Sequence, residues 1–159
     1  MSKFDIEEIK EFIRKQSPST KIYIGCDSES FRKNAEWHAN YFLVVVVHYD
    51  GNKGCKVFGN RITERDYTQD KKKPRFRLMN ECYKVSELFM ELHEAFGDKE
   101  VEVHLDLNPD KKYASSVVVT EAIGYIRATC NVVPMVKPDA FAASYCADRL
   151  GRGGLYKTG

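Results

Sequence analysis

The chain has 159 residues, of which 43% are hydrophobic and 12% aromatic, enough to fill the core of one domain. Its 25 basic and 23 acidic residues give a formal net charge of +2, too small on its own to indicate a nucleic-acid-binding protein. The longest apolar run, residues 41–47, has the length of a strand and is too short to span a membrane. These values exclude a disordered chain, a collagen, a coiled coil and a membrane protein.

The cysteines and the first ten residues indicate the cellular compartment of the protein. The five cysteines are Cys26, Cys55, Cys82, Cys130 and Cys146, and no two of them form a C-x-x-C pair. An odd number without paired spacing disfavours a structural zinc site and a disulfide framework, and favours reduced thiols. The first ten residues are charged where a signal peptide needs an apolar stretch. The sequence therefore predicts a cytoplasmic protein.

The first half of the chain is predicted to form a helix followed by three strands. Apolar residues at helical spacing predict a short amphipathic helix over residues 5–16. Strands are predicted at 21–27, 37–49 and 55–63. Residues 50–54 have the composition of a turn, so the third strand should return antiparallel to the second.

In the second half, helices and strands alternate. The predicted elements are a polar loop at 64–74, a helix at 75–96, a strand at 101–107, a helix at 115–130, a strand at 131–136, a helix at 138–150 and a mobile tail at 151–159. Three meandering strands followed by this alternation imply an α/β fold with a mixed five-stranded sheet and helices on its faces. The predicted organisation is an amphipathic helix within residues 1–20, a main domain at 21–150 and the tail.

Glu81 is out of place on the long predicted helix. Helical periodicity gathers an apolar stripe, into which Glu81 falls: Leu78, Cys82, Val85, Leu88, Phe89, Leu92 and Phe96. An ionised carboxylate that faces a core is costly unless a cation or hydrogen bonds meet it. Glu81 is therefore either a functional acid or the partner of nearby Arg75 or Arg77, and periodicity leaves both interpretations open.

Two further acids lie at or near strand ends. Asp27 ends an apolar strand, and Asp106 lies near the end of another, on the face that Glu102 and His104 share. Ligands commonly bind at the carboxyl ends of strands in an α/β sheet. The alternative is that Asp27 begins a turn and that residues 102–106 present an ordinary solvated face.

The last predicted helix carries an acid near each end. Asp139 lies just inside its start, where a negative charge interacts favourably with the helix dipole. Asp148 lies near the other end and needs another partner, which Lys137, Arg149 or Arg152 could supply. Two acids on strands and one on each of two helices are what a two-metal phosphoryl-transfer site needs, because Mg²⁺ and Mn²⁺ take oxygen ligands.

The segments that carry these acids resemble the RNase H-like superfamily and, more specifically, the YkuK-type family of predicted RNase H-like nucleases. They are residues 24–28, 77–81, 103–108, 136–144 and 147–149, and the resemblance extends over residues 21–150. It implies a nuclease that hydrolyses phosphodiester bonds of RNA or DNA with Mg²⁺ or Mn²⁺. The implied metal ligands, which are also the implied catalytic residues, are Asp27, Glu81, Asp106 and Asp148. Candidate accessory residues are Ser28, His104, Lys137 and Asp139.

One dense basic patch precedes the long helix. Its members, predicted to bind nucleic acid, are Lys71, Lys72, Lys73, Arg75 and Arg77. A solvated loop is the alternative interpretation of such a charge run. His104 could relay a proton, or it could be a half-buried strand histidine with a hydrogen-bond partner. The alternative function is a non-catalytic RNase H-like module that binds nucleic acid or protein, and the sequence leaves a homo-oligomer open.

Overall fold

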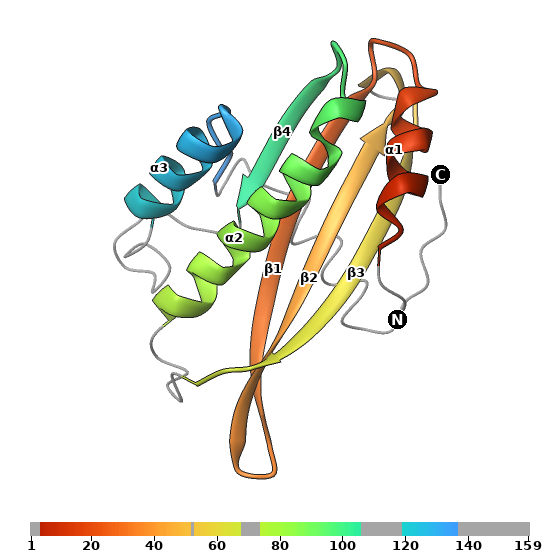
Figure 1. The fold of residues 1–159 in the computed structure, drawn as a ribbon. Helices are drawn as coiled ribbons and strands as arrows, with labels where there is room; N and C mark the ends of the chain where they lie inside the picture. Colours follow the sequence, from red (N-terminus) through yellow and green to blue (C-terminus); the bar gives the residue numbers. More distant parts are fainter. Residues whose placement is uncertain (1–3, 52, 68–73, 106–118, 137–159) are drawn as a thin grey trace.

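The computed structural model describes residues 4–51, 53–67, 74–105 and 119–136. Within these residues a four-stranded sheet in the order β3-β2-β1-β4 is flanked by three α-helices (Figure 1). The elements are α1 (Ile6–Arg14), β1 (Lys21–Lys33), β2 (Glu36–His48), β3 (Cys55–Arg65), α2 (Pro74–Leu92), β4 (Glu100–Leu105) and α3 (Val119–Cys130), with single 3₁₀ turns η1 (Tyr49–Gly51) and η2 (His93–Ala95). None of these helices combines the length and apolar character that crossing a membrane requires.

The sheet is mixed, as the order of elements predicts. β1 pairs antiparallel with β2 from Lys21↔His48 to Lys33↔Glu36. β3 returns antiparallel along β2, which confirms the prediction from the turn at residues 50–54. β4 joins the other edge of β1 in parallel, and the pairing ends at Cys26↔Leu105. The helix α2 makes the crossover from β3 to β4 that a parallel neighbour requires.

Two strand predictions need correction, and the first concerns the end of β1. Asp27 does not end this strand, because β1 continues to Lys33. Asn34 and Ala35, with φ values of 53° and 64°, then reverse the chain into β2. Two successive residues with positive φ are typical of the tight turns that match the twist of a hairpin.

The predicted fifth strand at 131–136 is not a strand in the structure, so the described part of the chain has four strands instead of five. This segment makes one parallel bridge, between Met135 and His104. The N–H of Leu105 donates to the Met135 carbonyl at 2.9 Å, and the N–H of Met135 donates to the Val103 carbonyl at 2.8 Å. Pro134 has no N–H to contribute to a longer ladder, and Asn131 has a φ of 58°, which is not extended backbone.

The main core lies on the face of the sheet that the helices cover (Figure 1). From β1 it takes Ile22, Ile24 and Cys26, which alternate along the strand and share one face. All three α-helices contribute to the same cluster, through Ile9 and Ile13 of α1, Leu78, Val85 and Leu92 of α2, and Ala122 and Ile126 of α3. A smaller cluster on the opposite face contains Tyr23, Phe42, Val44 and Val46.

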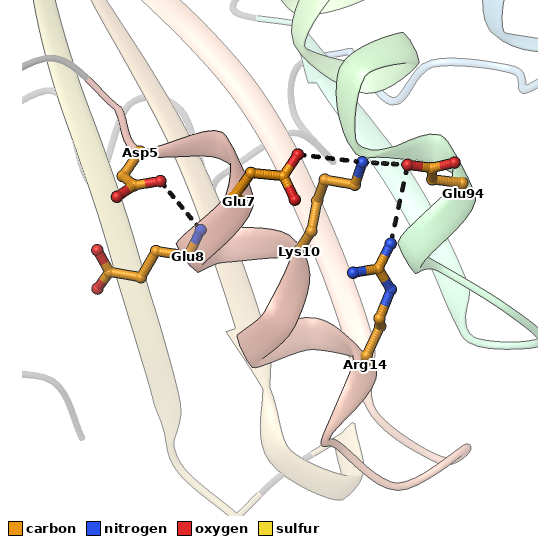
Figure 2. A network of polar contacts seen from close by, with 6 residues as sticks. All are labelled: Asp5, Glu7, Glu8, Lys10, Arg14 and Glu94. Atoms are coloured by element: carbon orange, nitrogen blue, oxygen red, sulfur yellow. Dashed lines mark hydrogen bonds and ion pairs between the residues drawn. The ribbon is translucent and has the colours of Figure 1, made fainter.

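Lys10 attaches α1 to the turn η2 that follows α2 (Figure 2). Its Nζ donates a hydrogen bond to Glu94 and lies 3.6 Å from a carboxylate oxygen of Glu7, while Arg14 lies 3.8 Å from Glu94. The bond to Glu94 raises the pKa of Lys10, and the same bond lowers the pKa of Glu94. The first turn of α1 is capped by Asp5, whose carboxylate accepts from the N–H of Glu8 at 3.1 Å.

Candidate active site

Ser28 connects two of the predicted metal ligands. Its backbone N–H donates to Oδ1 of Asp27 at 2.8 Å, and its Oγ donates to Oε2 of Glu81. Glu81 is buried with 2% exposure, as its place in the apolar stripe of α2 predicts. A buried carboxylate needs such donors, because removal from water is costly for its charge. The sequence indicates Ser28 only as an accessory residue, whereas in the structure it holds both acids.

Arg77 brings a positive charge to the same network. Its Nε donates to Oγ of Ser28 at 3.0 Å, so this hydroxyl accepts from Arg77 and donates to Glu81. Arg77 lies one turn before Glu81 on α2, which places both side chains on the side of the helix that meets β1. Arg77, which the sequence predicts to bind nucleic acid, is thus linked to Glu81 through the hydroxyl of Ser28.

The network lies next to the last described pair between β1 and β4. The last parallel pair is Cys26↔Leu105, so Asp27 is the first residue of β1 beyond this pairing in the described structure. Strand alternation turns Ser28 to the face of Cys26 and α2, and Asp27 to the opposite face. Ser28 therefore bonds to Glu81 through its side chain, on the face of α2, and to the preceding residue, Asp27, through its backbone N–H.

Several predicted site residues lie outside the described part of the chain. These are Asp106, Asp148, Lys71, Lys72, Lys73, Lys137 and Asp139, together with the side chain of Arg75. Among the residues that are described, no group of three or more His, Cys, Asp or Glu side chains is arranged to hold a metal ion. The four-carboxylate site consequently stays a prediction. Of its four residues the structure describes Asp27 and Glu81, each hydrogen-bonded to Ser28.

His104 lies on the face of β4 opposite the main core. It has 0% exposure, its Nε2 is 3.0 Å from Oε1 of Glu102, and its ring centroid is 5.1 Å from that of Tyr23. Burial lowers the pKa of His104, and the hydrogen bond with Glu102 offsets part of this effect. The structure thus shows a strand histidine with a hydrogen-bond partner, and it is fully buried instead of half-buried.

A cysteine adjoins each of the two acids in sequence. Cys26 precedes Asp27 and Cys82 follows Glu81, and both thiols have 0% exposure within the main core. Burial, reinforced by the charge of Glu81, raises the pKa of Cys82 to about 12 and that of Cys26 well above its usual value. Both side chains are therefore neutral thiols near pH 7, which are poor metal ligands and poor nucleophiles.

The element order and the mixed sheet, with acids next to the last described parallel pair, are those of an α/β protein, and the family comparison places it in the RNase H-like class. The model of the family described as Ribonuclease H-like matches residues 5–152, and the chain belongs to this family. This confirms the RNase H-like resemblance found in the sequence. A search of curated proteins and a search of solved structures each found no match.

Proposed function

We propose that this protein is a metal-dependent nuclease of the YkuK type that hydrolyses phosphodiester bonds of RNA or DNA. The observation that carries the proposal is the link that Ser28 makes between Asp27 and Glu81 beside the end of β4. Membership of the Ribonuclease H-like family supports a nucleic-acid-related role for this position. Asp106, which directly follows Leu105 in the chain, and Asp148 complete the proposed set of ligands and catalytic residues.

The donors at this position suit Mg²⁺ or Mn²⁺. Asp27 and Glu81 offer carboxylate oxygens, which these ions prefer, while the neighbouring cysteines are neutral thiols. A bound pair of ions would supply the positive charge that phosphodiester hydrolysis requires. Asp27, Glu81, Asp106 and Asp148 would hold them.

The other residues of the network orient groups and bind the substrate. Ser28 would orient Glu81 through its hydroxyl and Asp27 through its backbone N–H. Arg77 uses Nε for Ser28, and its guanidinium has four further N–H donors. Such donors match phosphate oxygens, so Arg77 would hold a phosphate next to the acids, with Lys71, Lys72, Lys73 and Arg75 as the proposed contacts along the strand.

The second candidate is a non-catalytic RNase H-like module that binds nucleic acid or protein. The observation that favours it is that Glu81 is buried and already hydrogen-bonded to Ser28, as a purely structural glutamate would be. Such a module would bind its partner equally well whether or not a divalent metal is present.

The experiment that separates the two functions is a cleavage assay with fluorescent RNA and DNA, single- and double-stranded, in Mg²⁺, Mn²⁺ or EDTA. We expect metal-dependent cleavage that falls by about 10³-fold or more in Asp27→Asn and in Glu81→Gln, because losing a metal ligand removes several kcal/mol of transition-state stabilisation. Glu87→Gln is the matched control, since Glu87 is an exposed acid on the same helix. Binding without cleavage would establish the module, and cleavage unchanged in Glu81→Gln would contradict the proposed site.

A further inference from the structure

A groove separates the end of β3 from the first turns of α2, which lie near each other in Figure 1. It has a volume of about 480 Å³, within the range of pockets that hold small ligands. Its lining includes Tyr41, Arg65, Tyr67, Phe76, Arg77 and Asn80. The groove is distinct from the Asp27–Glu81 pair but shares a border with it at Arg77.

Two aromatic side chains in this groove are exposed to solvent. Tyr67 is 76% exposed and Phe76 is 61% exposed, although burying either ring would be favourable. The guanidinium of Arg65 lies 4.8 Å from the centroid of the Tyr67 ring. Exposed aromatic rings accompanied by arginine are the elements with which proteins stack unpaired bases.

Arg77 connects this groove to the candidate active site. Its side chain lines the groove, and its Nε donates to Ser28, the residue that holds Asp27 and Glu81. A phosphate bound by Arg77 would therefore lie at the border between the groove and the Ser28 network. This arrangement matches a nucleotide unit, in which a base is attached to its phosphate through one sugar.

The polar groups of the groove suit the edges of a base. Asn80 donates from Nδ2 to Oη of Tyr41 at 3.2 Å, which leaves its amide carbonyl as an acceptor for a ligand. Two acids also line the groove, beside Arg65 and Arg77: Asp66, and Glu64, which pairs with Lys84 at 2.7 Å. A base that is paired and stacked within a duplex cannot present its face and edge to such a groove.

We propose that this groove binds an unpaired base, which makes single-stranded nucleic acid the preferred substrate class. That a bond is cleaved beside this groove is a statement that rests on the proposed nuclease function. The binding of the strand does not depend on it, because stacking and phosphate contacts need no metal.

The test measures binding of short fluorescent oligonucleotides by anisotropy in EDTA, with single-stranded DNA, single-stranded RNA and the corresponding duplexes as probes. Single strands should bind more tightly than duplexes. Phe76→Ala should weaken single-strand binding by about 5- to 150-fold, the loss of one stacked base. Phe76→Trp should restore it, and Tyr67→Ala should weaken it in the same way as Phe76→Ala. The matched control is Tyr83→Ala, since Tyr83 is a 46% exposed aromatic on α2 that contacts Tyr125 of α3 instead of the groove.

Three results would overturn this inference: tighter binding of duplexes, equal affinities in Phe76→Ala and Tyr83→Ala, or failure of Phe76→Trp to restore binding. If the Phe76 variants bind as expected but the protein cleaves nothing, the groove proposal stands and the nuclease proposal fails. If cleavage depends on Glu81 but Phe76→Ala binds single strands with unchanged affinity, the nuclease proposal stands and the groove proposal fails.

Discussion

The two halves of β1 differ, although they form one continuous strand. Residues 22–26 are all buried and pair with β2 on one side and β4 on the other. Residues 27–33 are half-buried or exposed, and their described strand pairing is with β2 alone. The change falls at Asp27 and Ser28, where the candidate active site lies. The inner half, residues 22–26, fixes the position of the strand, and the outer half, residues 27–33, offers polar groups to the site.

The largest effect should follow a change in the inner half. Ile24 has 0% exposure and belongs to the main core, so Ile24→Ala should lower the free energy of unfolding by about 2–5 kcal/mol. Urea denaturation measures this loss. Ile24→Val, which removes a single methylene, should cost about 0.5–1.5 kcal/mol. A loss below 1 kcal/mol in Ile24→Ala would mean that the inner half does not anchor the strand.

An intermediate effect should follow the loss of the Ser28 hydroxyl. Ser28→Ala leaves the buried carboxylate of Glu81 without this donor, so the free energy of unfolding in EDTA should fall by about 1–3 kcal/mol. Ser30→Ala, two residues further along the outer half, should change it by less than about 0.5 kcal/mol. Equal effects of the two substitutions would show that the bond to Glu81 contributes nothing to stability.

The smallest effect should come from the turn beyond the outer half. Ala35 has a φ of 64°, a conformation that glycine adopts without the steric cost of a Cβ. Ala35→Gly should raise the free energy of unfolding by about 0.5 kcal/mol, since the greater freedom of glycine in the unfolded chain offsets part of the relief. Ala35→Val should lower stability instead. If Ala35→Gly destabilises the protein, the turn is not strained at this residue.

Much of the fold and one acid of the site follow from periodicity. The order of the described helices and strands follows from the spacing of apolar residues, and the burial of Glu81 follows from its place in the stripe of α2. The outer half of β1 has no apolar pattern, and Asn34-Ala35 lacks the glycine that usually marks a two-residue turn. The contact between Ser28 and Glu81 joins residues 53 positions apart, and no local pattern contains that information.

The ion pair that attaches α1 to η2 constrains the order in which the native contacts form. Lys10 and Glu94 are 84 residues apart, so this bond closes a loop that contains β1, β2, β3 and α2. On a growing chain, Lys10 has only local partners such as Glu7 until Glu94 has been synthesised. The entropic cost of closing a loop grows slowly with the length of the loop. Strands and helices that have already folded shorten the loop and so lower this cost. The contact between α1 and η2 can therefore form only after β1, β2, β3 and α2 have been synthesised, whereas Phe12 of α1 meets Tyr49 and Phe58, which come earlier in the chain.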